Sequence, residues 1–98
     1  MQSTWWLASL GTLLVWARLD LHDSGIAQVF DSDGNHLTYE SEDSARAALL
    51  DADFVAFDGI DADDAQRMGF VLGEVAPPLG ASDEELKPRM MQTLHTER

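Results

Sequence analysis

Residues 13 to 21 alternate between the two sides of an extended chain. The odd-numbered side chains are all apolar, whereas the even-numbered ones change from apolar to polar: Leu14 and Trp16 are followed by Arg18 and Asp20, with His22 next in line. Successive side chains of a strand point to opposite faces, so this period of two predicts a half-buried strand. Any fold for this chain must therefore contain a sheet with one continuous apolar face.

Two turn signals follow that strand. The stretch His22–Gly25 combines Asp, Ser and Gly, which favour tight turns through local hydrogen bonds and positive φ. The pair Asp33 and Gly34 stands between two apolar runs, Ile26–Asp31 and Leu37–Tyr39. An Asp-Gly pair in this setting is typical of a hairpin with a primed turn. We therefore expect a three-stranded antiparallel meander.

Helical spacing follows the meander. Ser41 is suited to cap a helix that crosses the sheet, with an apolar stripe formed by Ala45, Ala48, Leu49 and Ala52. Phe54–Phe57 predicts a short fourth strand. Asp61 should cap a short acidic helix that Gly69 ends. The expected fold class is α+β.

The N-terminal stretch Trp5–Leu10 fits either a strand or the start of a helix. Because Gly11 disfavours a helix by about 1 kcal/mol relative to Ala, we expect a strand only from Thr12 onward. A short helix or turn should precede it.

The C-terminal stretch 82–98 is predicted to be an amphipathic helix or tail. The Pro- and Gly-containing segment 77–81 should act as a linker between it and a single acidic domain over residues 1–76. Pro88 would clash with a helix begun at Ser82, so a helix restarting at Pro88 is the simpler interpretation.

Charge narrows the choice of partners. Eighteen acidic and six basic residues give a net charge of -12, and between Asp20 and Asp64 the only basic side chain is Arg46. This charge repels phosphate backbones and anionic lipids, so we expect neither direct nucleic-acid binding nor membrane binding. A basic partner, or no partner, is what remains.

The location is expected to be cytoplasmic. The apolar run Trp5–Ala17 is shorter than the roughly 20 residues that span a bilayer, and it lacks the features of a secretory signal. The chain has no cysteine, which excludes disulfides and thiol-based metal sites and fits a reducing compartment.

One arrangement resembles a calcium-binding loop. Asp31, Asp33, Asn35 and Glu42 occupy positions 1, 3, 5 and 12 of an EF-hand loop. However, His36 stands where that loop needs Gly, and strand patterns flank the segment. A hairpin turn followed by a capped helix explains the same residues, so calcium binding is the third alternative.

No catalytic constellation is evident. The three histidines (His22, His36 and His95) are separated, the carboxylates have turn, cap or solvent-face explanations, and no glycine-rich phosphate loop is present. His36 is expected to face Asp31 across the hairpin. We therefore expect no enzymatic activity and no cofactor.

Two groups of residues are candidates for partner binding. Trp16 and Leu14 share the strand face that turns polar at Arg18, and either the N-terminal segment or another chain, including a second copy in a homodimer, should cover them. The second group consists of Asp58, Asp61, Asp63 and Asp64. We expect a non-enzymatic protein-protein interaction module. The alternative is an acidic inhibitor or DNA mimic that docks a basic nucleic-acid-binding protein.

Overall fold

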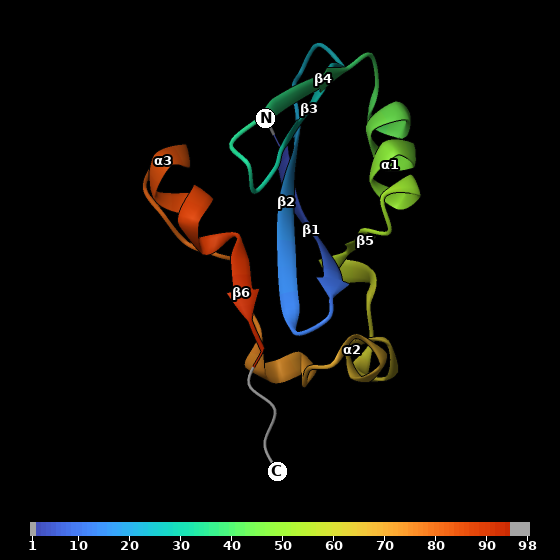
Figure 1. Ribbon diagram of the computed structural model, residues 1–98. Coiled ribbons are helices and arrows are strands. Elements are labelled where there is room, and N and C mark those ends of the chain that lie inside the picture. The colour runs from blue at the N-terminus through green and yellow to red at the C-terminus, as the bar shows by residue number, and fades with distance from the viewer. Residues whose placement is uncertain (1, 95–98) are drawn as a thin grey trace.

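A long hairpin is the centre of the sheet in the computed structural model, which describes residues 2–94 (Figure 1). Strands β1 (Gln2–Leu10) and β2 (Leu13–Leu21) pair along their whole lengths, from Gln2 opposite Leu21 to Leu10 opposite Leu13. Gly11 supplies the left-handed φ of 62° that the tight turn requires.

The short helix or turn predicted before Thr12 is therefore wrong, because residues 2–10 form β1. The reason lies in the packing of β1. Its neighbours Trp6 and Leu7 are both buried, since both faces of the strand are covered. A strand covered on both faces loses the alternation by which a sequence reveals it.

The sheet is antiparallel, with the strand order β4-β3-β2-β1-β5. Strands β3 (Ala27–Phe30) and β4 (His36–Tyr39) follow β2 in two consecutive antiparallel hairpins. Strand β5 (Val55–Ala56) pairs with β1 at the opposite edge of the sheet. A further strand, β6 (Met91–Thr93), pairs with the first half of β2, beside β3. The α+β class is confirmed.

Within the described residues, three α-helices lie around this sheet: α1 (Glu42–Asp51), α2 (Ala62–Met68) and α3 (Asp83–Leu86). Short 3-10 turns lie at η1 (Phe57–Gly59), η2 (Leu72–Glu74) and η3 (Lys87–Arg89). Each α-helix begins at a side chain that accepts a hydrogen bond from a backbone N–H in the first turn: Ser41, Asp61 and Ser82. Gly69 ends α2 in the left-handed conformation.

Apolar clusters lie on both faces of the sheet. On one face, Ala45 and Leu49 of α1 pack against Trp6, Ala17 and Leu19. On the other face, the cluster contains Leu7, Leu14, Trp16, Phe30, Ala65, Phe70, Leu86 and Met90. The second cluster draws on α2, α3 and the segment before β6, so the C-terminal half of the chain covers the face opposite α1.

The helix expected to restart at Pro88 is not formed, because Pro88 lies in η3 and residues 91–93 form β6. The backbone N–H of Trp16 donates to the carbonyl of Met90 at 2.8 Å, and that of Leu94 donates to the carbonyl of Thr12. Pairing with β2 thus replaces the local helical pattern. The last part of the predicted tail, residues 95–98 with His95, lies outside the described residues.

None of the helices in residues 2–94 has the length and apolar character needed to span a membrane.

Candidate functional site

Trp16 and Leu14 lie in the core, each with no exposed surface. Trp16 contacts Phe57 edge to face at a centroid distance of 5.3 Å, and its Nε1 donates to Oε1 of Gln92 at 3.0 Å. The cover comes from the chain itself, chiefly from its C-terminal half and not from the N-terminal segment alone. A partner has no access to these two side chains in this structure.

The residues with calcium-loop spacing do not converge on a cavity. Oδ1 of Asp31 accepts backbone hydrogen bonds from Asp33 at 3.0 Å and from Asn35 at 2.9 Å, so this carboxylate holds the hairpin turn together. Glu42 points along α1 to Arg46. Strands flank the turn on both sides, and over residues 2–94 no group of three or more His, Asp or Glu side chains is arranged to hold a metal ion.

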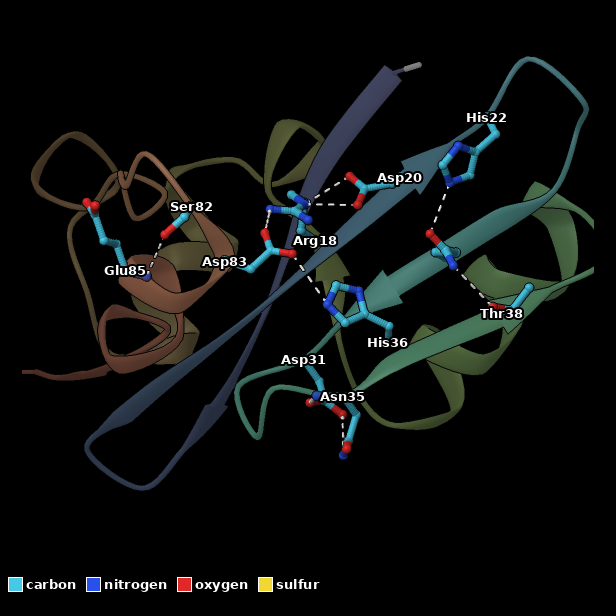
Figure 2. A network of polar contacts seen from close by, with 11 residues as sticks. Arg18, Asp20, His22, Asp31, Asn35, His36, Thr38, Ser82, Asp83 and Glu85 are labelled. Carbon is cyan, nitrogen blue, oxygen red and sulfur yellow. Dashed lines mark hydrogen bonds and ion pairs between the residues drawn. The ribbon is translucent and has the colours of Figure 1, made fainter.

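A polar network lies on the sheet face opposite α1 (Figure 2). The guanidinium of Arg18 donates to Asp20 at 2.9 Å and to Asp83 at 3.0 Å, and Asp20 also accepts from Ser3 at 2.7 Å. His36 reaches the second oxygen of Asp83 at 3.3 Å. The network therefore joins β1, β2, β4 and the first turn of α3.

This network satisfies its own polar groups. Burial of the guanidinium lowers the pKa of Arg18, but hydrogen bonds and charge attraction from Asp20 and Asp83 outweigh burial, so that its pKa is raised above the ordinary value. No buried side-chain polar atom among residues 2–94 lacks a partner. The network of Arg18, Asp20, Asp83 and His36 therefore acts as a structural clamp, a name that we keep for it below.

His36 lies opposite Phe30, not Asp31, in the β3–β4 register. The His36 and Phe30 rings stack with their centroids 4.7 Å apart. The guanidinium carbon of Arg18 lies over the Phe30 ring, 5.1 Å from its centroid. Asp31, the partner expected for His36, instead accepts backbone hydrogen bonds within the β3–β4 turn. His36 is thus held by the clamp and not by the turn.

The four aspartates Asp58, Asp61, Asp63 and Asp64 come together around the turn from η1 into α2. Asp61 and Asp64 form a capping box, in which each side chain accepts from the other's backbone N–H, and Asp64 also pairs with Arg67. Asp58 and Asp63 are exposed. Two of the four thus shape the helix start, while two are free to meet a partner.

Beside these aspartates lies an open pocket of about 320 Å³. Its lining combines apolar side chains of β5 and α2 with one ion pair: Val55, Ala56, Gly59, Ile60, Asp64, Arg67 and Met68. The pocket offers a place for one apolar side chain within an acidic surrounding.

The segment that leads to this pocket carries further carboxylates. We call the segment from Glu40 to Asp64 the acidic edge; it starts at the end of β4, at one edge of the sheet, and runs through α1 to β5, η1 and the start of α2 at the opposite edge (Figure 1). Within it, Glu42 and Asp64 are the only residues that form ion pairs with basic side chains of residues 2–94. Other exposed carboxylates have no ion pair or hydrogen bond among residues 2–94: Glu40, Asp43, Asp51, Asp53, Asp58 and Asp63.

A larger groove of about 740 Å³ lies between α2, η2 and β6. Phe70, Val75 and Leu94 give it an apolar lining, with Glu74 at its border. Because Leu94 is the last described residue, we assign this groove no ligand.

The pocket of β5 and α2 was not anticipated from the sequence. Phe54–Phe57 predicts a strand there, and the segment from Asp61 to Gly69 predicts a helix, but local patterns do not show which elements meet across a turn. The clamp was missed for the same reason, since no local pattern relates Asp83 to Arg18.

No family model, curated protein or solved structure matches this chain.

Proposed function

We propose that this chain is a non-enzymatic protein-protein interaction module that docks a basic protein on its acidic edge. The observation that carries this proposal is the combination, within the acidic edge, of exposed carboxylates without basic partners and, at its β5–α2 end, a mainly apolar pocket. Carboxylates alone are ordinary on a solvated face, whereas a pocket among them offers a defined contact.

The carboxylates and the pocket should contribute differently to binding. Opposite charges steer a partner toward the surface and raise its association rate, but exposed ion pairs add little affinity. Affinity comes mainly from an apolar side chain buried in a pocket. A partner segment with one aliphatic or aromatic residue flanked by Lys or Arg would use both features.

Basic partners include proteins that bind nucleic acids. If the partner's basic surface is also its nucleic-acid site, docking here makes the chain an inhibitor or DNA mimic. The net charge of -12 supports this class. We place the interaction in the cytoplasm, a location that the lack of cysteine supports.

The test uses a library of fluorescent peptides with one apolar residue flanked by Lys or Arg, read by anisotropy at low and high salt. We expect binding that weakens steeply as salt rises. The double variant Asp58→Asn/Asp63→Asn should weaken binding about five- to tenfold, because two exposed ion pairs of about 0.5 to 0.7 kcal/mol each are lost and about 1.4 kcal/mol corresponds to tenfold. Ile60→Glu should abolish the preference for the apolar residue.

The matched control is Asp33→Asn/Glu84→Gln, which removes the same charge from exposed positions outside the acidic edge. It should leave affinity within about twofold. Equal losses in both double variants would show that net charge alone attracts the peptides, and the proposed site would be wrong. For any full-length partner, competition by duplex DNA would identify the inhibitor or mimic class.

A further inference from the structure

A second surface lies at the closed end of the β1–β2 hairpin. The pairing register places six side chains on one face of the sheet there: Ala8, Leu10, Leu13, Val15, Met91 and Thr93. Ala8 lies opposite Val15, Leu10 opposite Leu13, and Met91 opposite Val15. We call these six residues the hairpin face.

The hairpin face is the uncovered continuation of the face on which α1 packs. Alternation along β2 puts Leu13 and Val15 on the same side as Ala17, which contacts α1 within its apolar cluster. Helix α1 lies over the other end of the hairpin (Figure 1). Leu10 is 68% exposed and Met91 45% exposed. Large apolar side chains grouped on an uncovered sheet face typically mark an interface.

Charge identifies the occupant. Residues 2–17 and 90–94 contain no acidic or basic side chain, so the parts of β1, β2 and β6 that form the hairpin face are neutral. A basic partner would find no carboxylate on these strands. A second copy of this chain, in contrast, could bury the face without placing like charges opposite each other, despite a net charge of -12.

We propose that the hairpin face binds a second copy of the chain, face to face across a two-fold axis. In such an arrangement the same patch serves both subunits. Leu10 and Met91 lose their exposed surface to the partner copy, while the acidic edge stays available for other proteins. Trp16 remains in the core of each subunit.

This pairing depends on salt in the opposite direction to docking on the acidic edge. Long-range repulsion between two acidic subunits opposes association, and salt screens it. Apolar burial at the hairpin face is not weakened by salt. Added sodium chloride should therefore strengthen self-association, whereas it weakens binding of basic peptides.

The test is sedimentation equilibrium of the full chain over a range of protein and salt concentrations. We expect the mass to rise from that of one 10.8 kDa chain toward twice that value with concentration, more readily at high salt. Leu10→Lys and Met91→Lys should each remain monomeric. Leu79→Lys, at an 81% exposed loop position outside the hairpin face, should dimerise like the unchanged chain.

Thermal unfolding followed by circular dichroism shows that each variant is folded, and two independent variants guard against loss of either. A monomeric mass for the unchanged chain up to roughly 1 mM protein at high salt, where even a weak association shows, would overturn the proposal. So would dimers of unchanged strength in the folded Leu10→Lys and Met91→Lys variants.

Discussion

Arg18 on β2 and Asp83 in the first turn of α3 are 65 residues apart in the sequence, and their side chains form a hydrogen-bonded ion pair at 3.0 Å. Asp20 holds the same guanidinium from within β2. One arginine thus fastens the C-terminal segment to the central hairpin, on the sheet face opposite α1 (Figure 2).

The clamp predicts an unequal response to two arginine substitutions. Removing one partner of a buried ion pair typically costs about 3 kcal/mol or more. Because Arg18 keeps some contact with water, we expect Arg18→Ala to lower the free energy of unfolding by about 2 kcal/mol. Arg67→Ala removes an exposed ion pair and should cost about 0.5 kcal/mol or less. Urea unfolding measures both, and equal losses would contradict the assignment of the clamp.

Adjacent methionines give a test of how firmly the C-terminal segment belongs to the core. Met90 is fully buried, whereas Met91 is 45% exposed. We expect Met90→Ala to cost about 2 to 5 kcal/mol, as other deletions of buried large side chains do. Met91→Ala should cost about 1 kcal/mol or less. Thermal unfolding at low protein concentration, where association does not contribute, compares the two; similar melting temperatures would mean that the segment is only loosely attached.

The β3–β4 turn depends on Gly34. Its φ is +89°, and a Cβ there would also lie 3.2 Å from the side chain of Lys87, which can move aside. Gly34→Ala should therefore destabilise the fold by about 1 kcal/mol or more through backbone strain. Gly73 has ordinary φ and open space around it, so Gly73→Ala is the matched control and should be neutral or slightly stabilising. Chemical unfolding that ranks the two in reverse order would refute this account of the turn.

Calcium should not change how much Asp31 contributes to the stability of the fold. Its carboxylate accepts two backbone hydrogen bonds in the turn, so Asp31→Ala should cost about 1 kcal/mol. We expect the same loss in melting temperature with calcium and with chelator. A stabilisation by calcium that disappears in Asp31→Ala would revive the loop as a metal site.

Much of the local structure is predictable from short patterns. Ser41 and Asp61 cap the helices that they were expected to cap, and Gly69 ends the second of them. The Asp-Gly pair marks the position of the turn between β3 and β4, but the primed turn expected there is not formed, because Gly34 has a positive φ and Asp33 does not. These signals involve a few neighbouring residues whose hydrogen bonds or φ values are local, so the rest of the chain has little influence on them.

The candidate site was predictable only in part. The aspartates around Asp61 were identified by charge, but the pocket beside them arises where β5 meets α2. Trp16 was placed correctly on its strand face, yet its cover could not be assigned, because the hydrogen bond to Gln92 joins residues 76 positions apart.

The sequence by itself determined the α+β class, the alternation of β2, the hairpin turns and the helix caps. The tertiary structure decided that residues 2–10 are a strand, that residues 91–93 leave their helical pattern, and that Arg18 meets Asp83. Each of these outcomes depends on pairing or packing between segments far apart in the chain. Burial and backbone pairing across such distances outweigh local preferences of about 1 kcal/mol or less per residue, and no local pattern records them.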